Sequence, residues 1–216
     1  MRRSKSSKSW LKEHFDDPYV KRAQSEGYRS RAVYKLKELD ARDALLRPGQ
    51  RVIDLGAAPG GWAQYASERV GKGGLVVALD ILPMTSLAGV EVMQGDFTEQ
   101  TVLEAVIARM AGHRADLVMS DMAPNISGVD VSDQARAMYL AELALDFARQ
   151  VLRPGGDFIV KVFQGAGYAE FHRALRNDFV RVLSRKPEAS RPRSKEMYLV
   201  GKGFRVADAE AQQAPP

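Results

Sequence analysis

Residues Arg51–Trp62 read RVIDLGAAPGGW, and this stretch decides the fold. Arg51–Leu55 is an apolar run of strand length, a glycine-rich turn follows, and residues 61–70 continue with apolar side chains at helical spacing. A strand, a glycine-rich turn and a helix in this order indicate an α/β protein whose parallel sheet holds a ligand at its carboxyl edge. Glycine suits such a turn because, without a side chain, it lets the backbone approach the ligand closely.

The spacing of the glycines narrows the kind of ligand. The dinucleotide pattern G-x-G-x-x-G is absent, because Gly56 is followed by Pro59 and then by the pair Gly60-Gly61. The chain also contains no Gly-Lys-Ser or Gly-Lys-Thr phosphate-binding loop. The turn therefore indicates a nucleotide-like ligand, and neither common phosphate-binding pattern accompanies it.

Strand-like and helix-like runs alternate along the rest of the chain, which predicts an α/β fold with a mainly parallel sheet and helices on both faces. Residues 152–156 (LRPGG) are a helix stop before a strand. The runs 180–184 and 197–204 are joined by a polar, basic segment without a helix, so we expect an antiparallel pair of strands at one edge. Two more helices are expected before the sheet, one opened by Asp17-Pro18 and one after Gly27. The predicted strands are 51–55, 75–81, 90–94, 116–120, 158–163 and 197–200, and the predicted helices are 61–70, 99–111, 133–152 and 167–178.

The composition limits the class of protein. A length of 216 residues suits one domain, and the absence of cysteine excludes disulfides and thiolate metal sites. The histidines His14, His113 and His172 do not have the spacing of metal ligands. No apolar run reaches the ~18 residues of a membrane span. We therefore predict a cytoplasmic protein, with no bound metal and no membrane contact, that acts as a monomer.

Positive charge gathers at both ends of the chain. Residues 1–50 hold 13 Lys and Arg against 7 Asp and Glu, and residues 181–216 hold 8 against 4, whereas residues 51–180 hold 11 against 16. Basic ends around an acidic centre indicate that the ends bind a polyanion and the centre a different ligand. The opening MRRSKSSKSW has the composition of an organelle transit peptide as well as that of a flexible RNA-binding arm. We favour the arm, because the basic character continues through Lys21, Arg22, Arg29 and Arg31.

Acidic residues stand at the ends of two further predicted strands. Asp80 lies 20 residues after Gly60, at the place where an acid accepts hydrogen bonds from ribose hydroxyls, and Asp96 follows the next strand. Each acid alone could be a helix cap or a turn residue. Acids at successive strand ends, however, suit an adenosyl ligand without phosphates. Trp62 could be a stacking wall for that ligand or part of the core, and the sequence leaves both open.

Two residues break the local pattern at later strand ends. Lys161 lies in the otherwise apolar run 158–163, and a lysine is almost never buried without a partner. Near the carboxyl end of its strand it would point into the ligand crevice, unless that end is frayed. Asp121 follows the strand 116–120 and could simply cap a loop, but adjacent strand ends would bring it beside Lys161.

Six stretches complete the pattern and together span nearly the whole chain. The stretches are SRAVYKLKELD (30–40), DLGAAPGGW (54–62), SDMAPN (120–125), RAMYL with ELAL (136–145), PGGDFIVKVFQG (154–165) and RKP with SRPRSKEMY (185–198). They closely resemble the FtsJ/RrmJ (RlmE) family of ribosomal RNA large subunit 2′-O-ribose methyltransferases.

The resemblance implies a catalytic tetrad and a cofactor site. The family's Lys-Asp-Lys-Glu tetrad falls on Lys35, Asp121, Lys161 and Glu196, in the family's order. Without the resemblance, Lys35 and Glu196 would pass as ordinary surface residues. The implied cofactor is S-adenosyl-L-methionine. The residues implied to bind it are Gly60, Trp62, Asp80, Asp96 and Asp121.

The resemblance also implies a fold and a substrate. The fold is the Rossmann-like S-adenosylmethionine-dependent methyltransferase fold, with a seven-stranded sheet whose last strand is antiparallel. The implied reaction is 2′-O-methylation of a ribose, in a uridine, in 23S ribosomal RNA of the large ribosomal subunit. We expect a single methyltransferase domain over 1–206, in which 1–48 form a basic arm and helices that contribute to RNA binding. Residues 49–206 would form the Rossmann-like core, and residues 207–216 a disordered tail.

The role of Lys161 stays open between two mechanisms. A ribose hydroxyl is a weak acid, so its methylation needs a general base or a group that stabilises the oxyanion. Burial and a second cation, Lys35, favour loss of the Lys161 proton, whereas Asp121 and Glu196 favour its retention. We favour the base and keep the stabilising cation as the alternative.

Two other functions fit parts of the sequence. Residues 121–124 (DMAP) resemble the acid-Pro-Pro-aromatic loop of amino-methylating enzymes, which would make the protein an RNA base N-methyltransferase. That loop has an aromatic residue where Asn125 stands, and it needs no Lys161. A non-catalytic RNA-binding or ribosome-assembly protein on the same scaffold would be expected to lose the cofactor acids or the lysines, and all are present.

Overall fold

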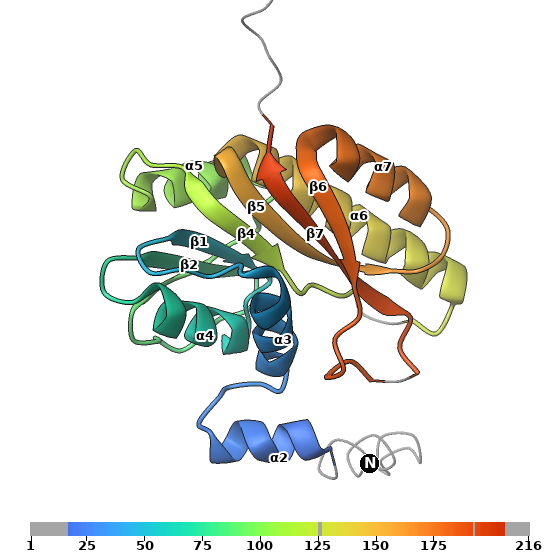
Figure 1. The fold of residues 1–216 in the computed structure, drawn as a ribbon, viewed down its shortest axis with the longest axis horizontal. Helices are drawn as coiled ribbons and strands as arrows, with labels where there is room; N and C mark the ends of the chain where they lie inside the picture. Colours follow the sequence, from blue (N-terminus) through green and yellow to red (C-terminus); the bar gives the residue numbers. More distant parts are fainter. Residues whose placement is uncertain (1–16, 125–126, 192, 206–216) are drawn as a thin grey trace, which may run out of the picture.

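The computed structural model describes residues 17–124, 127–191 and 193–205 (Figure 1). The predicted arm at the start of the chain and the predicted tail 207–216 lie outside these residues. No helix within the described ranges is long and apolar enough to cross a membrane.

Seven strands of the described chain form one sheet in the order β3-β2-β1-β4-β5-β7-β6. The strands from β3 to β5 in this order are mutually parallel, and β7 is antiparallel to both of its neighbours. The predicted seven-stranded, mainly parallel sheet with an antiparallel last strand is therefore confirmed. The strands are β1 (Arg51–Leu55), β2 (Leu75–Asp80), β3 (Val90–Gln94), β4 (Ala115–Ser120), β5 (Leu152–Phe163), β6 (Phe179–Arg185) and β7 (Glu196–Phe204).

Helices cover both faces of the sheet, and each face has its own apolar core. Helices α3 and α4 pack on one face, around Leu36, Trp62 and Ile159, whereas α5, α6 and α7 pack on the other, around Phe147 and Phe158 (Figure 1). The helices are α2 (Pro18–Ser25), α3 (Val33–Asp43), α4 (Gly61–Val70), α5 (Gln100–Arg109), α6 (Asp130–Val151) and α7 (Tyr168–Asp178).

The order of the strands determines where a ligand can bind. The chain builds outward from β1 through β2 to β3, and then restarts on the other side of β1 with β4 and β5. A reversal of this kind leaves a crevice at the carboxyl ends of the strands on either side of it, because successive loops turn away in opposite directions. This rule places a ligand crevice between the carboxyl ends of β1 and β4.

The helix stop at 152–156 is confirmed, but the predicted start of the next strand is wrong. Helix α6 ends at Val151, and β5 begins at once with Leu152, which pairs with Ala115 of β4. The pairing then shifts register before Leu117 meets Asp157. Proline and glycine are tolerated within a strand at such an irregularity, so the PGG sequence belongs to β5 and not to a loop.

The two helices before the sheet form as predicted. Asp17 caps α2 by accepting a hydrogen bond from the Tyr19 backbone N–H at 2.9 Å, and Pro18 occupies the first turn. Helix α3 is joined to α4 by the indole of Trp62, which donates to the carbonyl of Ala32 at 2.8 Å. The result is that α3 is held firmly over the carboxyl ends of the strands.

Candidate active site

Four side chains predicted from distant parts of the sequence meet at the carboxyl edge of the sheet. Lys161 lies near the end of β5, Asp121 directly follows β4, Glu196 begins β7, and Lys35 projects from α3. In the antiparallel pair β5–β7, Lys161 lies opposite Tyr198, two residues from Glu196. Residues two apart in a strand share a face of the sheet, and α3 covers this face.

The four charged groups alternate in sign along a short chain of contacts. The Nζ of Lys161 donates to the Asp121 carbonyl at 2.6 Å and lies 3.0 Å from Asp121 Oδ1. The Nζ of Lys35 lies 2.8 Å from Glu196 Oε1 and 3.9 Å from Asp121 Oδ1. The Lys161 side chain is only 7% exposed and that of Asp121 17%, so these charges interact in a partly dry environment. The structure thus brings all four predicted tetrad residues together.

Tyr198 is a fifth member of this cluster, and the sequence does not single it out. It is fully buried, and its hydroxyl donates to Asp121 Oδ1 and accepts from Lys35 Nζ at 3.2 Å. Burial, followed by the nearby carboxylates Asp121 and Glu196, raises the pKa of Tyr198 well above its usual value. The hydroxyl therefore stays protonated and serves as a neutral donor that orients Asp121. Its position two residues after Glu196 in a strand is the signal that could have revealed it.

Both carboxylates of the cluster are held in the ionised form. Burial alone would raise the pKa of Asp121, but the ammonium groups of Lys161 and Lys35 outweigh it and lower that pKa below its usual value. Burial acts in the same way on Glu196, and Lys35 again reverses it, so its pKa is also lowered. At neutral pH the two carboxylates are anions that fix the positions of the two lysines.

The backbone of the glycine-rich turn lies in close contact with the segment before α3. Gly60 has φ 108° and stands at the start of α4, a conformation that side chains rarely adopt. A side chain at Gly61 would clash with Ser30, because its Cβ would come within 2.4 Å of that hydroxyl oxygen. Trp62 is 3% exposed, and its ring lies 5.7 Å from that of Tyr198, so the indole belongs to the core.

Asp80 and Asp96 shape the loops in which they lie. Asp80 accepts hydrogen bonds from the backbone N–H groups of Ala58 and Leu82, each at 2.8 Å, and so ties the glycine-rich turn to the loop after β2. Asp96 Oδ1 accepts from the backbone N–H and the hydroxyl of Thr98, at 2.9 and 2.7 Å. An ionised carboxylate has about four acceptor sites, so both residues keep acceptor capacity for ligand hydroxyls.

A further acid, Asp54 of β1, lies beneath this edge. It is 1% exposed, and its Oδ2 has no hydrogen-bond partner among the described residues. Burial first, and then the charges of Asp121 and Asp80, raise its pKa well above the usual range. Asp54 therefore stays protonated beneath this edge, and the negative charge there comes from Asp121. A phosphate would be disfavoured beside that charge, whereas a ligand with positive charge and hydroxyl groups suits it.

Asp54→Asn should flatten the pH dependence of stability. A carboxyl whose pKa is raised by folding contributes stability below its unfolded pKa, near 4, and loses it as pH rises toward the folded value. The wild-type protein should lose up to about 1.4 kcal/mol of unfolding free energy per pH unit from this group, and the variant should not. Urea unfolding of both proteins between pH 4 and 8 measures the difference. Parallel stability curves would show that Asp54 is ionised in the folded protein.

The described ranges contain no group of three or more His, Asp or Glu side chains that could hold a metal ion.

Known proteins share both the sequence and the fold. Residues 28–204 match the FtsJ-like methyltransferase family. The chain is 63% identical over 201 residues to the Ribosomal RNA large subunit methyltransferase E of Chromohalobacter salexigens, with 93% of this chain and 96% of that protein covered. The protein of the same name from Pseudomonas aeruginosa is 58% identical over 205 residues, with 95% and 99% covered.

Two solved structures show the same architecture. A Plasmodium falciparum protein described as a ribosomal RNA methyltransferase matches with a TM-score of 0.74 at 29% identity, over 82% of this chain and 98% of its own. The MycE methyltransferase of the mycinamycin pathway, solved with Mg and SAH, matches with a TM-score of 0.53 at 14% identity, over 79% of this chain and 47% of its own. At that identity MycE supports the fold alone.

The strand order and the match to a solved ribosomal RNA methyltransferase place the protein among the Rossmann-like methyltransferases. Within that class, the chain belongs to the FtsJ-like methyltransferase family. The predicted family and the prediction of an enzyme are both confirmed.

Proposed function

We propose that this protein transfers a methyl group from S-adenosyl-L-methionine to a ribose 2′-hydroxyl, in a uridine, of 23S RNA in the large ribosomal subunit. The observation that carries the proposal is the alternating cluster of Lys35, Glu196, Asp121 and Lys161 beside an acidic crevice. The relatives' names, which specify large-subunit ribosomal RNA, support the substrate. We also propose that the enzyme acts in the cytoplasm as a monomer.

The acids at the strand ends suit this cofactor. S-adenosyl-L-methionine supplies a methyl group that its sulfonium already activates, and it also carries an ammonium group and ribose hydroxyls. Asp80 and Asp96 have acceptor capacity for hydroxyls, and the ionised Asp121 places negative charge toward the cationic part. Gly60 and Trp62, at the start of α4, stand next to these acids in the proposed cofactor site.

Lys161 is the residue that we assign to proton removal. Its Nζ lies between the carbonyl and the carboxylate of Asp121, which aim it from the end of β5. Lys35 is held on the other side of Asp121 by Glu196, so a second cation stands ready to stabilise the developing alkoxide. Asp121, Glu196 and Tyr198 act as positioning residues, because their contacts fix both lysines. Alignment of two bound reactants contributes on the order of 7–11 kcal/mol in favourable cases, which explains the value of such a fixed arrangement.

The position of the transferred methyl group tests the proposal. Large-subunit RNA incubated with the protein and methyl-labelled cofactor is digested to nucleosides and separated by chromatography. We expect the label on a 2′-O-methylated nucleoside. Label on a base would identify an RNA base N-methyltransferase, and the absence of label with intact RNA binding would identify a non-catalytic RNA-binding protein.

Asp80→Ala should weaken the binding of S-adenosyl-L-methionine by about 1–3 kcal/mol, the range of a charge-assisted hydrogen bond. Titration calorimetry measures the affinity, and unfolding curves verify that the variant folds. A matched control is Asp116→Ala, because Asp116 also accepts from a backbone N–H, that of Arg51 at 2.7 Å, but at the opposite edge of the sheet. Unchanged affinity in folded Asp80→Ala would remove Asp80 from the cofactor site.

A further inference from the structure

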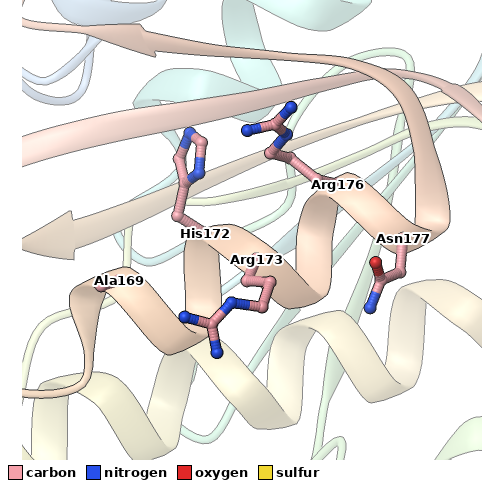
Figure 2. A pocket seen from close by; sticks show the side chains of 5 residues that line it. All are labelled: Ala169, His172, Arg173, Arg176 and Asn177. Atoms are coloured by element: carbon pink, nitrogen blue, oxygen red, sulfur yellow. The ribbon is translucent and has the colours of Figure 1, made fainter.

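A groove with basic walls runs between α7 and the edge strand β6, away from the catalytic cluster. One hollow of about 440 Å³ lies on α7, where Figure 2 shows His172 and Arg176 pointing to one side of the helix and Arg173 to the other. A second hollow, of about 480 Å³, is lined by His172 and Arg176 from α7, by Arg181 from β6, and by Arg205. The two hollows share His172 and Arg176, so they form one continuous surface, which we call the α7–β6 groove.

The arginines of the α7–β6 groove are free to bind a ligand. Arg173, Arg176, Arg181 and Arg205 are exposed, and among the described residues none of their guanidinium groups has an ion pair or a hydrogen bond. The acid at the end of α7, Asp178, is already paired with Arg149 of α6 at 2.8 Å. Positive charge therefore accumulates on this surface without internal compensation.

The cations near the start of the described chain are in a different state. Arg22 pairs with Glu26 at 2.6 Å, and Arg31 is bound by Asp17 and by the carbonyl of Ala189. Arg29 donates to the carbonyls of Pro59, Thr85 and Ser86, at 3.3, 2.9 and 2.6 Å. The sequence analysis assigned the basic residues in α2 and before α3 to RNA binding. The guanidinium groups of most of them thus bind acceptors within the protein. The unpaired arginines of the α7–β6 groove lie instead beside α7, which packs on the face of the sheet opposite to α3.

Helix α7 connects the catalytic edge of the sheet with the α7–β6 groove. Helix α7 begins at Tyr168, shortly after the carboxyl end of β5, and its residues lead away from that edge toward Arg176. The hydroxyl of Tyr168 is 3.1 Å from that of Ser184 near the end of β6, so helix and strand run side by side. With a rise of about 1.5 Å per residue, α7 extends roughly 16 Å, which is the reach of several nucleotides.

We propose that the α7–β6 groove binds the sugar–phosphate backbone of the RNA substrate outside the catalytic site. The planar guanidinium fork matches a phosphate with two parallel hydrogen bonds. The three unpaired forks of Arg176, Arg181 and Arg205 around the second hollow, with Arg173 on the other side of α7, suit a chain of phosphates better than a single anion. The exposed Val180 also lines the second hollow and offers an apolar contact to the sugar edge. This inference rests on the proposed RNA substrate and adds a second contact surface to it.

The salt dependence of RNA binding tests the proposal. Each phosphate contact contributes roughly 0.7–0.9 to the slope of log affinity against log salt. Arg176→Gln/Arg181→Gln should therefore lower the slope by about 1.4–1.8 and weaken binding of a transcribed large-subunit RNA roughly tenfold near 0.1 M salt. The KM for RNA should rise, while kcat and the affinity for S-adenosyl-L-methionine should stay unchanged.

A matched control separates specific contacts from general loss of charge. Arg109 stands in the last turn of α5 as Arg176 stands in the last turn of α7, but it pairs with Glu91 at 3.2 Å. Arg109→Gln should leave the slope as in the wild type, and Arg176→Gln alone should lower it by roughly 0.7–0.9. An unchanged slope in the double variant, or an equal loss in Arg109→Gln, would overturn the proposal. RNA that binds but is never methylated would contradict the proposed function instead, because the slope is measured without turnover.

Discussion

Lys161→Arg should be as inactive in methyl transfer as Lys161→Ala, although it keeps the positive charge. Arginine effectively never loses its proton in a protein, so it cannot act as a base. General-base catalysis contributes about 10²–10⁴-fold, and we expect a loss of that size in both variants. Single-turnover rates of the wild type and both variants, at saturating RNA and cofactor, measure the chemical step.

The control for Lys161→Arg is a second lysine in the same sheet. Lys202 of β7 is paired with Asp157 at 2.5 Å, much as Lys161 is paired with Asp121, but it lies away from the catalytic edge. Lys202→Arg should retain wild-type rates. Substantial activity in Lys161→Arg would assign Lys161 the role of a stabilising cation.

The alternation of strands and helices, the crevice and half of the tetrad follow from the sequence by simple physical rules. Lys161 and Asp121 stand out because a charge inside an apolar strand, or directly after one, must find a partner. Strand periodicity then places them on one edge, as the structure has them. The proposed catalytic lysine of the protein is thus visible in the pattern of a single strand.

The remaining site residues depend on contacts that no local pattern encodes. Lys35 lies on a helix over the strand ends, and Glu196 starts a strand that crosses back antiparallel, so only the family resemblance selected them. Tyr198 passes for a core aromatic until its hydroxyl is seen beside Asp121. The unpaired state of the arginines in the α7–β6 groove could not be predicted from the sequence for a related reason. Whether an arginine is paired depends on acids brought close by the fold, not on its neighbours in the chain.

Asp121→Asn should destabilise the protein strongly, because Lys161 and Lys35 share this carboxylate. Its removal leaves a lysine with a 7% exposed side chain and no compensating charge at Asp121, a loss that we place at about 2–4 kcal/mol of unfolding free energy. Methyl transfer should also fall sharply, since the same contacts aim Lys161. Urea unfolding at pH 7 measures the stability. Asp146→Asn, which breaks an exposed pair with Arg149, should leave it nearly unchanged.

The pH dependence gives Asp121 a signature that a general packing defect lacks. Because folding lowers its pKa, the stability that it contributes is complete above its unfolded pKa, near 4, and is lost as pH falls through the folded value. The gap between wild type and Asp121→Asn should therefore narrow from pH 5 to pH 2. Replacing the unpaired cation as well, in Asp121→Asn/Lys161→Met, should restore part of the stability at pH 7, because a buried charge without a partner costs more than an apolar side chain in its place. A constant gap across pH, with no recovery in the double variant, would mean that Asp121 stabilises the fold through its shape and not through its charge.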